Sequence, residues 1–180
     1  CVIEGNSSIK GNASDRASGA GIYVLGAASS SFHVQMQDCL VRDNLGVGRA
    51  CQGGGLFLNH GRFSLLRTTF ARNTTGGLRQ QEATTYSGSG GGAWIQNAAP
   101  DSRVGFCIFE GNSAIQGGGG SYGGGLHVSV GPVTLENSIF RDNKASYIGA
   151  VRFDTPGQTN IFRNCLMYRN HALYWGGAAA

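Results

Sequence analysis

Two short hydrophobic patterns alternate along the chain. In the first, an apolar residue stands three positions before an asparagine, at Ile3/Asn6, Val41/Asn44, Phe70/Asn73, Phe109/Asn112, Phe140/Asn143 and Met167/Asn170. In the second, two small residues precede an apolar–any–apolar triplet, starting at Ala20, Gly54, Gly91, Gly124, Gly149 and, incompletely, Gly176. Self-similarity of this kind is the signature of a repeat architecture.

The spacing of the two patterns separates a fixed part of each repeat from a variable part. From the small pair to the next asparagine the chain runs 18–23 residues, whereas from an asparagine to the next small pair it runs 7–19. The shortest full repeat, Asn143 to Asn170, spans 27 residues, which fits one coil of a β-solenoid. We therefore predict a single solenoid segment over 1–180, with variable loops that leave from one edge at 7–20, 45–53, 74–90 and 113–123.

Each repeat contains three short apolar segments. The first is the triplet after the small pair, the second lies eight to ten residues before the asparagine, as at Phe63/Leu65, and the third holds the apolar residue of the first pattern. Apolar and polar residues alternate within the first two segments, which predicts β-strands. The prediction is an all-β solenoid of about six coils with three short strands per coil.

Stacking the coils about 4.8 Å apart places equivalent residues on one another. Phe70, Phe109 and Phe140 then form a buried aromatic stack, and the asparagines form a structural ladder: Asn6, Asn44, Asn73, Asn112, Asn143 and Asn170. Asparagine suits a turn because it tolerates left-handed backbone and its amide can bond to the coils on either side. The residue before the apolar position is usually apolar too, as at Leu40 and Ile108, so we expect a bend or an outward groove there.

These repeats resemble those of the polymorphic outer membrane proteins of chlamydiae, in which Phe-x-x-Asn alternates with Gly-Gly-apolar. The motif is matched by Phe70-Ala-Arg-Asn73, Phe109-Glu-Gly-Asn112 and Phe140-Arg-Asp-Asn143, with Ile3, Val41 and Met167 as conservative departures. The resemblance covers nearly the whole chain. It implies a right-handed parallel β-helix in an extracellular or surface-displayed protein with a structural or adhesive role. The translocator barrel of that family has no counterpart here, so the outer-membrane assignment does not carry over.

Composition excludes several other classes of protein. Of the 180 residues, 31 are glycine, 13% are charged and 41% are hydrophobic, a balance that excludes a charged disordered chain. The glycines do not recur every third residue, which excludes collagen, and glycine costs about 1 kcal/mol per helical position relative to alanine, which disfavours a helical bundle. Since no apolar run approaches 18 residues, we expect no membrane-spanning helix and no direct membrane insertion.

The net charge of +4 does not indicate nucleic-acid binding. The arginines are scattered along the chain, whereas a nucleic-acid interface needs basic residues clustered on one face.

Four of the five cysteines occupy one repeat position, five residues before the asparagine: Cys1, Cys39, Cys107 and Cys165. Only Cys1 and Cys39 fall in neighbouring coils, where stacked Cα atoms lie within disulfide range. We expect the others to be small stacking residues, since Thr68 and Ser138 fill the same place elsewhere. No Cys-x-x-Cys occurs, so we expect no metal or redox site.

Three Asn-x-Ser/Thr sequons begin at Asn6, Asn12 and Asn73. Asn12 falls in a variable loop and is the best glycosylation candidate. Asn6 and Asn73 are ladder positions, so we expect them to be structural unless they lie at an exposed corner.

A carbohydrate-active enzyme with a pectin lyase-like β-helix is the alternative function. Glycoside hydrolysis needs two carboxylates about 5–9.5 Å apart. The acids Glu4, Asp43, Glu110 and Asp142 instead alternate with Arg42, Arg72, Arg141 and Arg169, which predicts charge pairs between neighbouring coils. A Gly-x-Ser-x-Gly match at 119–123 lacks the strand-to-helix context of a nucleophile elbow. We therefore predict no enzyme and no cofactor.

The long loops are the expected contact surface, because binding residues often lie on loops carried by a rigid scaffold. Tyr86, Trp94 and Tyr122 can offer stacking faces to a glycan or a surface protein, although the loops can equally be solvated spacers. His127 is read as an outward strand residue. The chain starts and stops within a repeat, so we expect an internal piece of a longer protein, or copies that stack through open ends.

Overall fold

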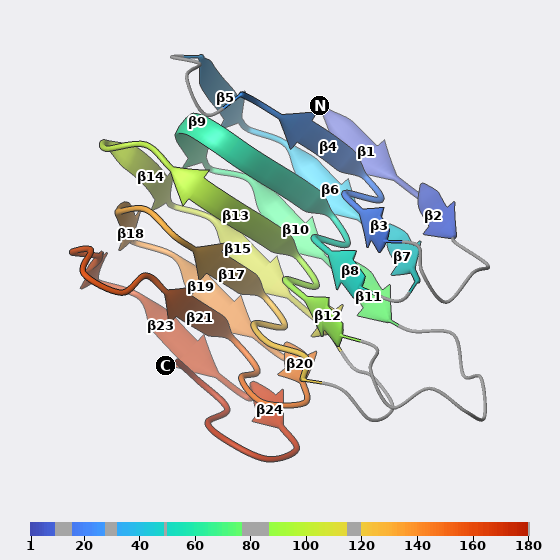
Figure 1. Cartoon of the computed structure of the whole chain (residues 1–180). Helices are drawn as coiled ribbons and strands as arrows, with labels where there is room; N and C mark the ends of the chain where they lie inside the picture. Colours follow the sequence, from blue (N-terminus) through green and yellow to red (C-terminus); the bar gives the residue numbers. More distant parts are fainter. Residues whose placement is uncertain (10–15, 28–31, 49, 77–86, 115–119, 180) are drawn as a thin grey trace.

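The computed structural model describes residues 1–9, 16–27, 32–48, 50–76, 87–114 and 120–179. Within these ranges every regular element is a β-strand (Figure 1). The all-β prediction is confirmed. Two residues singled out from the sequence, Asn12 and Tyr86, lie outside the described residues.

The strands form four sheets. The first contains, in spatial order, β1 (Val2–Glu4), β6 (Leu40–Arg42), β10 (Thr69–Ala71), β15 (Ile108–Glu110), β19 (Ile139–Arg141) and β23 (Leu166–Tyr168). The second contains β2 (Ser7–Ile9), β7 (Leu45–Val47), β11 (Thr74–Gly76), β16 (Ser113–Ala114), β20 (Lys144–Ala145) and β24 (His171–Ala172). The third is made of β12 (Ser87–Ser89), β8 (Ala50–Gln52) and β3 (Arg16–Ser18).

The fourth sheet is the largest and has two halves joined by the long strand β9 (Leu56–Leu66). One half holds β4 (Ile22–Leu25), β9, β13 (Ala93–Ala98), β17 (Leu126–Ser129) and β21 (Val151–Asp154). The other half holds β5 (His33–Gln37), β9, β14 (Ser102–Gly105), β18 (Val133–Glu136) and β22 (Ile161–Arg163).

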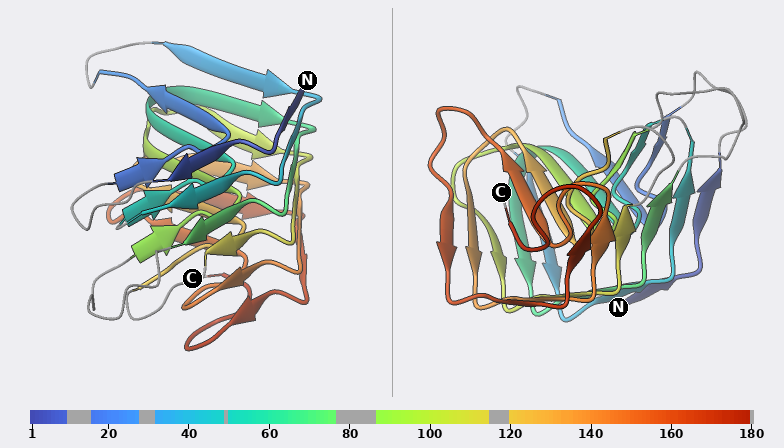
Figure 2. Two further views of the ribbon diagram at one scale, coloured as in Figure 1. Left: turned by 90° about the vertical axis from the view of Figure 1, so that its right-hand side faces the viewer. Right: turned by 90° about the horizontal axis from the view of Figure 1, so that it is seen from below.

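Every pairing between these strands is parallel and joins one repeat to the next. We call one repeat of the chain a rung. The sheets curl around a shared interior and give an open half-barrel outline when seen from below (Figure 2).

The structure corrects the expected number of strands. The segments 7–20, 45–53, 74–90 and 113–123, predicted as loops, contain all strands of the third sheet and all strands of the second except β20 and β24, as well as connecting turns. These strands are only two or three residues long and most consist of small or polar residues, such as Thr74–Gly76, so they give little apolar alternation. They are held by backbone pairing with the rungs on either side.

Aromatic and aliphatic side chains fill the interior. Phe70, Phe109 and Phe140 are fully buried, with ring centroids 4.8 and 4.7 Å apart and planes within 8° of parallel. Such stacking adds about 0.5–1.5 kcal/mol per pair to the burial of the rings. Leu56 and Leu65, both fully buried, belong to the same core cluster.

The asparagines form a hydrogen-bonded column. In each described rung the side-chain Nδ2 donates to Oδ1 of the next asparagine, for example Asn112 to Asn143 at 3.0 Å. The same Nδ2 donates back to the carbonyl of the apolar residue in the preceding rung, as from Asn112 to Phe70 at 2.8 Å. The backbone N–H of each asparagine also donates to the next Oδ1, so every amide binds both neighbouring rungs.

The left-handed residue at this corner is the one before the asparagine. Positive φ values of 52–67° occur there in every rung, at Gly5, Asp43, Arg72, Gly111, Asp142 and Arg169, whereas the asparagines themselves are not left-handed. The bend that we expected within the strand therefore occurs after it, at the residue before the asparagine. The apolar residue that precedes the buried one is half-buried in the inner rungs, at Leu40, Ile108 and Ile139, and exposed in the end rungs, at Val2 and Leu166.

Small pairs and asparagines alternate along the chain because the second small residue of a pair packs against an asparagine side chain. A Cβ atom on Gly92 would lie 3.1 Å from the Asn112 amide carbon and 2.5 Å from the carbonyl oxygen of Gly125. Gly55 meets Asn73 in the same way, at 2.9 Å. The second glycine is thus required for close backbone approach.

Candidate binding face

One column of side chains runs along the outer face of the fourth sheet. It is formed by the middle residue of each apolar–any–apolar triplet, in register on neighbouring strands: Tyr23, Phe57, Trp94, His127 and Arg152. Because side chains alternate along a strand, the two apolar neighbours point into the core and this residue points away from it. The column begins at an open cleft and ends in a covered polar cluster.

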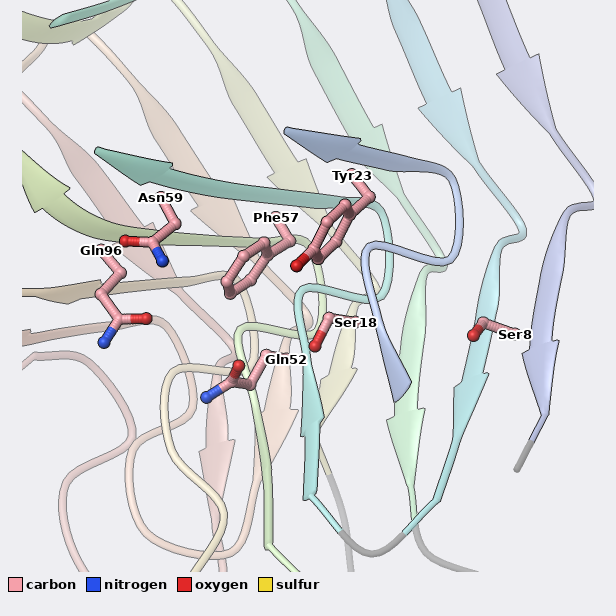
Figure 3. A pocket seen from close by; sticks show the side chains of 7 residues that line it. All are labelled: Ser8, Ser18, Tyr23, Gln52, Phe57, Asn59 and Gln96. Atoms are coloured by element: carbon pink, nitrogen blue, oxygen red, sulfur yellow. The ribbon is translucent and has the colours of Figure 1, made fainter. Parts of the chain in front are cut away.

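The cleft lies at the Tyr23 end and has a volume of about 500 Å³ (Figure 3). Its lining residues come from β2, β3, β4, β8, β9 and β13: Ser8, Ser18, Tyr23, Gln52, Phe57, Asn59 and Gln96. The Tyr23 and Phe57 rings stack with centroids 5.0 Å apart and planes 7° from parallel. Phe57 is only 4% exposed, whereas Tyr23 is 52% exposed, so the outer ring rests on a fixed inner ring.

At the other end His127 is 3% exposed and its Nε2 lies 3.0 Å from Asp154 Oδ2. Burial lowers the pKa of His127, and the hydrogen bond to Asp154 opposes that shift only in part. The pKa of Asp154 falls to about 2, chiefly through the same hydrogen bond. The pair is therefore a neutral imidazole that donates from Nε2 to a carboxylate, and His127 Nδ1 is buried with no partner among the described residues.

Aromatic rings cover this pair. Trp94 lies against His127 with centroids 4.4 Å apart, and Tyr122 meets the same imidazole edge-on at 6.3 Å. The Arg152 guanidinium lies 3.6 Å from the centroid of Tyr122 and also pairs with Asp154. Trp94 and Tyr122, two of the three residues expected to contact a ligand, thus meet through His127.

The cluster has limited chemical capacity as a catalytic site. His127 sits on the outer side of its strand, as the sequence indicates, but residues of adjacent rungs bury it. A buried neutral imidazole with no open path offers a substrate no accessible base. The exposed part of the column is the Tyr23 cleft.

The acids of the described residues are mostly neutralised by cations one rung away. Seven of the eight form ion pairs; the eighth is Asp101. The four charge pairs predicted from the sequence are present: Glu4–Arg42, Asp43–Arg72, Glu110–Arg141 and Asp142–Arg169. Glu136 is nearly buried between Arg103 and Arg163, and the Arg163 hydrogen bond is the main cause of its lowered pKa.

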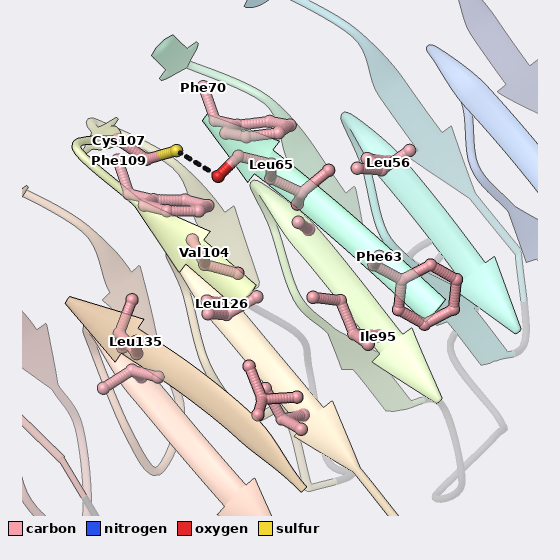
Figure 4. Packing of buried hydrophobic residues seen from close by; sticks show 14 of the residues in the cluster. Leu56, Phe63, Leu65, Phe70, Ile95, Val104, Cys107, Phe109, Leu126 and Leu135 are labelled. Atoms are coloured by element: carbon pink, nitrogen blue, oxygen red, sulfur yellow. Dashed lines mark hydrogen bonds between the residues drawn. The ribbon is translucent and has the colours of Figure 1, made fainter. Parts of the chain in front are cut away.

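The cysteines are free thiols in this structure. The Sγ atoms of Cys1 and Cys39, the pair within disulfide range by sequence, lie 2.8 Å apart in neighbouring rungs. Cys107 lies in the core beside Phe109, with Sγ 3.4 Å from the Leu65 carbonyl (Figure 4). Burial raises the pKa of Cys51 and of Cys107 to about 11, so both remain protonated.

Two of the sequons lie on the asparagine column. Asn73 is fully buried and its Nδ2 donates to Val41 and to Asn112, which leaves no room for a glycan on that atom. Asn6 is exposed at the end of the column and donates to Asn44.

Comparison with known proteins yields no match: no family model fits the sequence, and neither a curated protein nor a solved structure is significantly similar. In the part of the chain that the structure describes, no group of three or more histidine, cysteine or acidic residues is placed to hold a metal ion. Likewise, the described ranges contain no helix long and apolar enough to cross a membrane.

Sequence analysis missed Tyr23, Phe57, Gln52 and Gln96 as candidate site residues. The signal was present in the middle position of the triplets, where Tyr, Phe and Trp follow one another in three successive repeats. Aligning the repeats by that position would have shown the aromatic column.

Proposed function

We propose that this chain is a right-handed parallel β-helix that serves as an extracellular structural or adhesive scaffold. The parallel pairing of every rung with the next supports a β-helix, since the first and second sheets gain one strand per repeat in the same direction. The shared glycine–asparagine motif agrees with the chlamydial surface-protein repeats that the sequence resembles.

The observation that supports the scaffold role is that acidic side chains are engaged in ion pairs and are absent from the lining of the cleft. Six of the eight described acids form ion pairs with arginines of a neighbouring rung, a seventh, Asp154, pairs with Arg152 on its own strand, and the cleft on the outer face is lined by uncharged residues. An enzyme acting on a polysaccharide would need free, convergent acids in such a cleft. The polysaccharide-active alternative therefore has less support.

Both ends of the rung stack present apolar side chains on strands that are paired along one edge only. Val2, Ile9 and Leu25 are exposed at one end, and at the other Leu166 on β23 and Leu173, directly after β24. Open strand edges invite pairing with further strands. We propose that further rungs, from flanking sequence or another copy, cover these edges.

Labelling of intact cells tests the proposed location and role. Antibodies against this chain are expected to label unpermeabilised cells of the source organism, and labelling only after permeabilisation would refute the proposal. In parallel, the purified chain is incubated with a panel of polysaccharides. We expect no release of reducing ends and no unsaturated uronide, and turnover of any of them would establish the enzyme alternative instead.

A further inference from the structure

The cleft beside Tyr23 combines an aromatic surface with surrounding polar groups, most of which form no side-chain hydrogen bond within the described residues. Tyr23 is held flat against Phe57, so its ring needs little ordering when a ligand binds. A cleft of about 500 Å³ falls within the roughly 300–1,000 Å³ of small-molecule sites.

The polar groups of the cleft are free to bind a ligand. The side-chain amides of Gln52 and Gln96 form no hydrogen bond within the described residues, and the same holds for the hydroxyls of Ser18 and Tyr23. Asn59 uses only Oδ1, which accepts from Asn97 at 2.9 Å, so its Nδ2 is available. In Figure 3 these side chains surround one space on the outer face of β4, β9 and β13.

The chemistry of these groups selects the ligand. Amides and hydroxyls both donate and accept, which matches the hydroxyl groups of a sugar. The C–H face of a pyranose packs on an aromatic ring, whose face is electron-rich. None of the lining residues is charged, so no group here would compensate a carboxylate or sulfate on the ligand.

We propose that this cleft binds a neutral oligosaccharide, with Tyr23 as the stacking platform and Gln52, Asn59 and Gln96 as the hydroxyl-binding groups. The inference rests on the proposed adhesive function and names the class of its ligand. It also places the contact surface on the sheet face, where the outward column begins, whereas the sequence pointed to the long loops.

The test is a glycan array probed with the purified chain. It carries neutral gluco-, xylo-, manno- and galacto-oligosaccharides beside oligogalacturonates and sulfated glycans, and any binder is then titrated by calorimetry. We expect at least one neutral class to bind. Tyr23→Ala is expected to weaken that binding about tenfold, while Tyr23→Phe retains it, because the ring supplies the stacking energy. Gln96→Ala is expected to weaken it about threefold to tenfold through the loss of one or two hydrogen bonds.

Matched controls separate the cleft from the rest of the surface. Tyr174→Ala removes an exposed aromatic ring and Gln158→Ala an exposed amide, both on rungs far from the cleft, and both are expected to leave affinity within twofold. Tyr23 is exposed on an edge strand, so its variants fold, as circular dichroism would verify.

Three results would overturn the cleft: no neutral glycan binds, only acidic glycans bind, or binding is insensitive to Tyr23→Ala and Gln96→Ala. If any of these results is obtained while intact cells are labelled, the proposed ligand of the cleft is wrong and the scaffold proposal stands. Labelling only after permeabilisation refutes the scaffold's location independently of the array.

Discussion

The asparagine column makes a sharp prediction about stability. Replacing Asn112 by alanine removes its donation to the Phe70 carbonyl and to Asn143 Oδ1, and its acceptance from the backbone N–H of Asn73. Asn143 Oδ1 keeps a second partner, since it also accepts the backbone N–H of residue 112 at 3.0 Å. The Asn73 N–H and the Phe70 carbonyl lose these bonds in a fully buried setting.

The Phe70 carbonyl belongs to β10, which is paired with β15, so the Asn73 N–H is the buried group left without a partner. One such group costs about 1–3 kcal/mol, and Asn112→Ala should lower the free energy of unfolding by about that amount. At roughly 2–4 °C per kcal/mol for a chain of this size, the melting temperature should fall by about 2–12 °C. Circular dichroism melts measure the shift. The matched control is Gln158→Ala, which removes an exposed amide outside the column and should shift the melting temperature far less.

The variant Asn112→Asp tests the column through the pH dependence of the melting temperature. The ionised carboxylate cannot donate to Phe70 or Asn143, whereas the protonated acid can replace one of these bonds. The folded protein therefore raises the pKa of the new carboxyl above its unfolded value of about 3.9. The melting-temperature gap to wild type should be smallest below about pH 4 and widen as pH rises through the folded pKa. An equal gap at pH 3 and pH 7, or an Asn112→Ala variant no less stable than the Gln158→Ala control, would refute the column as a source of stability.

Three further predictions follow from the close contacts described above. Gly92→Ala should cost several degrees in melting temperature, because its Cβ would lie 2.5 Å from a carbonyl oxygen, whereas Gly46→Ala, with no atom nearer than 3.9 Å, should cost little. Since burial lowers the pKa of His127, stability should fall as pH drops below about 6.5, where the unfolded imidazole takes up a proton more readily than the folded one; NMR should find that the native ring titrates at lower pH than an unfolded histidine, and His127→Phe should reduce this pH dependence. Mild oxidation should couple Cys1 to Cys39, detected as a linked peptide by mass spectrometry, and recovery of both as free thiols would count against it.

The repeat, its period and its strand class could be predicted because they depend on side-chain type at fixed spacing. The positions of the Phe-x-x-Asn units correctly indicate which strands are equivalent, since Phe70 pairs with Phe109 and Phe109 with Phe140. The charge pairs could also be predicted, because equivalent positions in adjacent repeats carry opposite signs.

The remaining features depend on atoms from several rungs. Strands such as β11 and β16 have no hydrophobic pattern and exist because the backbone of neighbouring rungs pairs with them. The burial of His127 requires Trp94 and Tyr122, which come from separate segments. The cleft likewise combines residues of six strands, so no single stretch of sequence contains it.

The parallel pairing also determines how this chain can fold. The hydrogen bonds from one asparagine to the next along the column span only 27–39 residues, so each rung needs just its neighbour as a template. At a synthesis rate of roughly 5–20 residues per second, a new rung emerges roughly every 1–8 s. Each can dock on a finished edge before the next arrives, and we expect native structure to grow in chain order during translation, with a single advancing edge exposed at any time.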